Sequence, residues 1–304
     1  MRTARLKPMD IPMFYHLYNR VAGEPGYRPF AEAEKEKFVQ LLHKLDAFFC
    51  VKVVSYQVMD NHFHLVAHAP DKPPEVDEVC QRYTAYYGPR HTLDPSDPYC
   101  RVLAERMRDI SWFMRLLQQQ FSTWFNKTRP TPRRGTIWAG RFKHTLLGDG
   151  RAAWECCKYV EMNAVRAGMA DNPADYRFGS FGVWSQAGYH PFEHNVRDVL
   201  LPWIEGIYPF ENTGQLHRSW SDTFAELTGV EVEPDGKVAA FCTRIDRRVR
   251  YWTDGLVIGS ELFLTEMTGR YGHILRPKKR GWNRARGADD RPSGLYCYKR
   301  LRSI

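Results

Sequence analysis

Apolar positions in the first 70 residues follow two different periods. Residues 12–21 and 51–58 are rich in aromatic and β-branched side chains, and residues 62–69 open by alternating histidine with apolar residues, so we predict three strands. Residues 31–49 carry apolar side chains three and four positions apart, which predicts a helix. Asp60-Asn61 suits a tight turn between the second and third strands. The order is therefore β-α-β-β.

The same two periods return further along the chain. Residues 112–125 have the apolar spacing of a helix, residues 136–147 that of a strand, and residues 151–167 that of another helix. The full order is β-α-β-β-α-β with one more helix. This order predicts an α+β fold with a ferredoxin-like (RRM-like) antiparallel sheet and helices on one face.

We assign these elements to a first domain at residues 1–181, which is interrupted by a proline-rich stretch. Pro-Pro, Gly-Pro and Asp-Pro steps punctuate residues 70–109, and the only helical spacing there covers residues 76–87. We interpret this stretch as an insertion on the scaffold.

The rest of the chain, residues 182–304, is predicted to form two further regions. Residues 182–236 are punctuated by glycine, tryptophan and proline and are expected to be an irregular connection. Residues 237–304 are expected to be a helical carboxy-terminal extension, with helices at 237–252 and 255–271 and a basic tail.

The charge of the chain changes this picture from a plain fold to a class of partner. The formal net charge is +9, and residues 276–302 hold ten Lys/Arg against Asp289 and Asp290. Such an excess of positive charge favours a polyanionic partner, most often nucleic acid. For residues 276–302 alone, a basic tail that is only solvated explains the charge equally well.

Other partners and compartments are less compatible with the composition. No apolar run is long enough to span a membrane, and the first residues lack the apolar core of a signal peptide. Seven cysteines without a Cys-x-x-Cys pair indicate neither a disulfide framework nor a zinc ribbon. We therefore expect a cytoplasmic protein.

Two stretches carry candidate chemistry. In a strand, His62 and His64 point to one face while Phe63 points to the other. Two imidazoles on one face suit a divalent metal, or they are surface histidines of a half-buried strand. In the helix at 151–167, Tyr159 and Asn163 stand one turn apart on the face opposite the apolar stripe. An ordinary exposed tyrosine fits that position as well.

A third stretch, from Asn126 to His144, is basic and aromatic. It contains six Lys/Arg, no acidic residue, and the interleaved aromatic residues Trp138 and Phe142. Basic side chains interleaved with aromatic ones are typical of single-stranded nucleic-acid binding.

Five motifs, in order along residues 14–181, resemble the single-tyrosine HUH transposases, and in particular the REP-associated tyrosine transposases. They are Tyr-His-Leu-Tyr-Asn-Arg (15–20), Asn-His-Phe-His (61–64), Trp-Ala-Gly-Arg-Phe-Lys (138–143), Tyr-Val-Glu-Met-Asn-Ala-Val-Arg-Ala-Gly (159–168) and Asp-Tyr-Arg-Phe-Gly-Ser (175–180). The chain departs from the family in having Asp60 before Asn61, and Ala164 after Asn163, where proline is usual.

The resemblance implies a division of labour among these residues. Tyr159 would be the catalytic nucleophile, and His62, His64 and Asn163 would hold Mg²⁺ or Mn²⁺. The DNA-binding residues that we predict are Asn19, Arg20, Arg133, Arg134, Trp138, Arg141, Lys143 and Arg166. His68 shares the parity of His62 and His64, and we expect it to face DNA or solvent.

The activity implied is metal-dependent cleavage and transfer of single-stranded DNA at hairpin-forming repeats, through a 5′-phosphotyrosine. The expected partner is single-stranded or hairpin DNA, with no membrane and no small-molecule cofactor, and the protein would be a monomer or a homodimer. Two alternatives remain: a rolling-circle replication initiator or relaxase, and a domesticated nucleic-acid-binding protein without activity.

Overall fold

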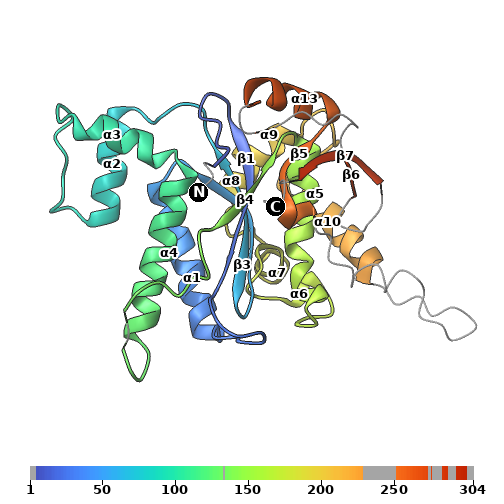
Figure 1. Ribbon diagram of the computed structural model, residues 1–304, viewed down its shortest axis with the longest axis horizontal. Coiled ribbons are helices and arrows are strands. Elements are labelled where there is room, and N and C mark those ends of the chain that lie inside the picture. Colours follow the sequence, from blue (N-terminus) through green and yellow to red (C-terminus); the bar gives the residue numbers. More distant parts are fainter. Residues whose placement is uncertain are drawn as a thin grey trace, which may run out of the picture.

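A seven-stranded sheet forms the centre of the computed structural model (Figure 1). The structure describes residues 5–132, 134–228, 251–272, 275, 283–286 and 292–299. The strand order is β2-β3-β1-β4-β5-β7-β6, and every pairing is antiparallel except that of β4 with β5. The strands are β1 (Met13–Arg20), β2 (Lys52–Val58), β3 (His62–Ala69), β4 (Lys143–Leu147), β5 (Gly255–Gly259), β6 (Asn283–Arg286) and β7 (Pro292–Lys299).

The first half of the chain follows the predicted order of elements. Helix α1 (Glu32–Phe48) joins β1 to β2, and helix α4 (Ile110–Lys127) precedes β4. The strand predicted at 136–147 forms only from Lys143 onward. Before Lys143, this segment makes only a single bridge to the described part of the sheet, between Val21 and Trp138, because the Trp138 ring turns into the core against Phe38 and Phe121.

Helices cover both faces of the sheet, which corrects the expectation of helices on one face (Figure 1). Helices α1 and α4 pack on the face that carries Leu17 and Leu65. The other face carries Phe14 and Val66 and is covered by α5 (Gly150–Glu161) and α7 (Ser180–Ala187), and α10 (Thr213–Thr228) packs against these two helices. The physical reason is that β1 and β3 are buried on both sides, so each face needs an apolar cover.

Residues 70–109 lie at the edge of the α1–α4 layer as two helices, α2 (Val76–Tyr87) and α3 (Tyr99–Met107) (Figure 1). The region expected to be irregular is largely helical instead. Besides α7 and α10 it contains α8 (Glu193–Asn195), η2 (Val196–Leu200) and α9 (Leu201–Ile204). Its tryptophans explain the difference, because Trp184 and Trp220 are core residues of the second face.

The carboxy-terminal region adds strands to the sheet, which corrects the expectation of a mainly helical extension. The helix predicted at 255–271 begins only at Glu261, as α13 (Glu261–Arg270). The β-branched run before it forms β5 and pairs with β4. Most of the helix predicted at 237–252 and most of the basic tail lie outside the described residues, and the domain boundaries stay a prediction.

None of the helices in the described part of the chain combines the length and the apolar composition needed to cross a membrane.

Candidate functional site

One pocket of about 680 Å³ gathers most of the residues singled out in the sequence. It lies where β1 and β3 meet the segment 139–143 and the helices α5 and α6 (Asn163–Arg166). Nine predicted site residues line it: Asn19, Arg20, His62, His64, Arg141, Lys143, Tyr159, Asn163 and Arg166. The lining includes four Arg/Lys and, among the residues that the structure describes, no Asp or Glu. The pocket is therefore electropositive, as a phosphate site requires.

His62 is oriented by its neighbour in the turn. Its Nδ1 lies 2.8 Å from the Asn61 side-chain oxygen, and the Asn61 amide nitrogen donates to the Tyr27 carbonyl at 2.9 Å. Because the Asn61 oxygen can only accept, Nδ1 of His62 carries the proton. In the neutral ring, Nε2 then holds the lone pair.

His64 is oriented by a buried relay that the sequence analysis missed. Nδ1 of His16 lies 2.8 Å from the Trp252 carbonyl, and its Nε2 lies 2.8 Å from Nδ1 of His64. Burial lowers the pKa of His16 to about 4, so this ring is neutral. The carbonyl can only accept, so His16 donates from Nδ1 and accepts at Nε2, and His64 must donate from Nδ1. Nε2 of His64 is then its unprotonated nitrogen.

This tautomer pattern is the one found in metal-ligating histidines, which donate their second ring nitrogen to an outer partner. The two rings lie 5.2 Å apart, centroid to centroid, at 87°. Asn163 donates from its amide nitrogen to the Val160 carbonyl at 3.2 Å, which makes its side-chain oxygen the acceptor end. No group of three His, Cys, Asp or Glu suited to a metal occurs in the described ranges, so a third protein ligand here would be another residue type, and Asn163 lines the same pocket. Two imidazoles and an amide oxygen fit a divalent ion of mixed nitrogen and oxygen preference.

Tyr159 is buried rather than exposed, with 2% of its surface accessible. Trp252, just before β5, stacks on its ring at 5.8 Å, and the rings of His16 and His64 meet it edge-on at 5.8 and 6.1 Å. The Arg166 guanidinium lies over the ring at 4.9 Å and donates to the Tyr159 carbonyl at 3.0 Å. The predicted exposed face of this helix is thus covered by the carboxy-terminal region.

A break between α5 and α6 separates Tyr159 from Asn163. The helix turns at Met162, and the Gln57 side chain bridges the break, donating to the Glu161 carbonyl at 2.8 Å and accepting from the Ala164 nitrogen at 2.9 Å. Gln57 therefore sets the relative placement of the two predicted site residues. Little in the sequence singled it out, because Gln57 is one of three polar residues, with Lys52 and Ser55, in this strand.

Glu161 anchors this helix from inside the core. Its carboxylate accepts from the Ser55 hydroxyl at 2.8 Å, from the Ser180 hydroxyl, and from the Phe181 nitrogen at 3.2 Å. Burial raises its pKa to about 7, because the hydrogen bonds only partly offset the loss of hydration. Sequence reasoning missed Glu161 because its partners come from two distant segments.

The remaining predicted DNA contacts lie outside the pocket. Arg134 is exposed and away from it, and Arg133 lies outside the described residues. Trp138 and Phe142 are buried, which does not fit a role in stacking on bases. His68 is half-buried against the rings of Phe14 and Trp203 and does not line the pocket, and its expected exposure to DNA or solvent stays a prediction.

No protein-family model matches the chain, and no curated protein does. Among solved structures, the chain is similar to a REP-associated tyrosine transposase bound to a REP hairpin, with 14% identity and a TM-score of 0.40. The match covers 69% of this chain and 94% of that one. Similarity at this level assigns neither a family nor an activity.

Proposed function

We propose that this protein is a metal-dependent single-stranded DNA endonuclease and strand transferase, transposase-like in its chemistry. It would act at hairpin-forming repeats through a 5′-phosphotyrosine. One observation carries the proposal: Tyr159, Asn163, His62 and His64 line the same electropositive pocket although about a hundred residues separate the histidines from the tyrosine. We also propose that the sheet is of the ferredoxin-like type.

The chemistry assigns a role to each group. The Tyr159 oxygen forms a bond to phosphorus while the bond from phosphorus to the 3′ oxygen breaks. The phenol gives up its proton, and the departing 3′ oxygen takes one up, leaving a free 3′-hydroxyl. Strand transfer is the reverse step with a different 3′-hydroxyl.

The side chains around the nucleophile prepare it for this step. Arg141 and Lys143 hold the phosphate electrostatically, and Arg166 places positive charge over the tyrosine ring, which favours a developing phenolate. His62, His64 and Asn163 would hold Mg²⁺ or Mn²⁺, and the bound ion would stabilise charge developing on the phosphate.

The test uses a second pocket tyrosine as control. Tyr159→Phe removes the reacting oxygen, so the covalent adduct with a labelled hairpin oligonucleotide should vanish on a denaturing gel while binding persists. Tyr18 also lines the pocket, and its hydroxyl donates to the Thr253 carbonyl, so Tyr18→Phe should still form the adduct. Peptide mapping of the wild-type adduct should find DNA on Tyr159. An adduct that survives in the Tyr159 variant, or that maps to Tyr18, would refute the assignment.

A further inference from the structure

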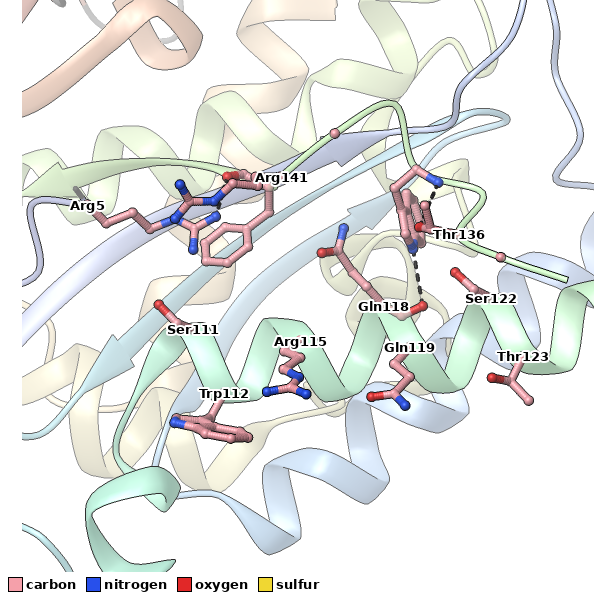
Figure 2. A pocket seen from close by; sticks show the side chains of 14 residues that line it. Arg5, Ser111, Trp112, Arg115, Gln118, Gln119, Ser122, Thr123, Thr136 and Arg141 are labelled. Carbon is pink, nitrogen blue, oxygen red and sulfur yellow. Dashed lines mark hydrogen bonds between the residues drawn. The ribbon is translucent and has the colours of Figure 1, made fainter. Parts of the chain in front are cut away.

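A second pocket, of about 880 Å³, lies on the other face of the sheet, between α4 and the segment 135–142 (Figure 2). Gly140 and Arg141 line both pockets, so this segment is the wall between them. A β-carbon added at Gly140 would meet no atom within 4 Å, which leaves open space over the wall at this point. The two pockets therefore share one wall, and no side chain stands on it at Gly140.

The floor of the second pocket holds two buried polar atoms that have no hydrogen-bond partner among the described residues. Gln118 and Ser122 stand one turn apart on α4, and both side chains rise toward the facing segment (Figure 2). Ser122 is 5% exposed, and its hydroxyl and the Gln118 amide nitrogen are buried without a hydrogen-bond partner in the described part of the chain. A buried polar group left unsatisfied costs roughly 1–3 kcal/mol. A ligand with hydrogen-bonding edges would recover this energy.

The rest of the lining is cationic and aromatic. Arg5, Arg115 and Arg141 contribute positive charge, and no described lining residue is acidic. Arg5 lies 3.5 Å from the Phe142 ring centroid and donates to the Phe142 carbonyl at 3.0 Å, which joins the amino-terminal segment to that wall. Arg115 is exposed beside the Trp112 indole, at 4.8 Å. Amide and hydroxyl groups on the floor and cations at the rim match a base and its phosphates.

We propose that this second pocket binds one unpaired nucleotide of the DNA strand that enters the first pocket. Gln118 and Ser122 contact the edge of the base, and Arg115 contacts a phosphate. The pocket thereby sets a base preference at one position near the scissile phosphate. This inference rests on the proposed function for the identity of the ligand, but its binding test does not require cleavage.

The test compares three variants on α4. The double variant Gln118→Met with Ser122→Ala removes both polar groups while keeping similar volume, and it should fold because it removes unsatisfied groups. Arg115→Ala removes the phosphate contact. Gln120→Ala is the matched control, since Gln120 lies on the same helix but donates to the Tyr86 hydroxyl away from the pocket. The probes are fluorescein-labelled single-stranded oligonucleotides with one base varied at a time, measured by anisotropy.

The expected results separate base recognition from phosphate binding. The wild type and the control should prefer one base at one position by about tenfold or more, and the double variant should lose that preference. Arg115→Ala should weaken binding of all four bases alike and lower its salt dependence. A wild type without any base preference, or a double variant that keeps it, overturns the inference. If the wild type does not cleave DNA but its base preference still depends on Gln118 and Ser122, only the proposed catalysis fails.

Discussion

The relay from Trp252 through His16 to His64 gives the sharpest quantitative prediction. His16→Leu places an apolar side chain of similar size in this buried position and removes one hydrogen-bond donor and one acceptor. The Trp252 carbonyl loses the His16 donor, and the Thr145 hydroxyl at 3.2 Å shares its one proton with the Gly255 carbonyl at 2.8 Å. Nδ1–H of His64 loses its acceptor, and His64 is only 4% exposed. Losing a partner at a buried donor costs about 1–3 kcal/mol.

The expected effect on function is larger for metal binding than for folding. Without the relay, His16 no longer holds the proton of His64 on Nδ1. The ring can then carry its proton on Nε2, and a protonated Nε2 cannot bind a metal. Loss of such an outer partner typically costs 10–100-fold in metal affinity or activity. The Mn²⁺ concentration for half-maximal cleavage should rise by this factor, while the rate at saturating Mn²⁺ should recover most of the wild-type value.

The control is His16→Gln, because an amide offers both N–H donors and a carbonyl acceptor and can replace both hydrogen bonds. It should restore the metal dependence largely to that of the wild type. Nitrogen-15 shifts of His64 give a readout that needs no activity. They should report a proton on Nδ1 in the metal-free wild type and in His16→Gln, and a mixture of tautomers in His16→Leu.

Two results would refute this reasoning. One is a wild-type His64 with its proton on Nε2 in the metal-free protein. The other is a His16→Leu variant whose maximal rate falls in proportion to folded protein while its Mn²⁺ requirement is unchanged, because His16 would then be a structural residue only.

Two further predictions concern stability. Burial raises the pKa of Glu161 from 4.5 to about 7, so its contribution is fully present below pH 4.5 and is lost as the pH rises through 7, by roughly 3 kcal/mol. Urea unfolding across this range should show that slope in the difference between wild type and Glu161→Gln, and a difference independent of pH would contradict it. Trp138 packs on the rings of Phe38, Phe63 and Phe121, so Trp138→Ala should lower the free energy of unfolding by about 3–5 kcal/mol. Unchanged stability with weaker binding of single-stranded DNA would instead restore Trp138 as a stacking residue.

The amino-acid sequence by itself determined the elements whose signal is local. The periods of apolar positions located β1, α1, β2, β3 and α4 to within a few residues, because each period reports which side of an element is apolar. Strand alternation also placed His62 and His64 on one face, and both line the pocket. Tyr159 and Asn163 line it too, although the helix that was expected to carry both breaks at Met162.

Only the tertiary structure decided what covers each of these faces. Periodicity distinguishes apolar from polar positions, but it does not identify the partner of a polar side chain. Tyr159 lies on the more polar side of its helix, yet the Trp252 ring buries it. The Trp252 carbonyl also accepts a hydrogen bond from His16, which is 236 positions away in the sequence. Trp138 lies in a basic stretch, yet its ring enters the core. The run after Asp254 pairs with β4 because that edge of the sheet offers hydrogen bonds to a buried strand, and no local pattern reports such a long-range pairing.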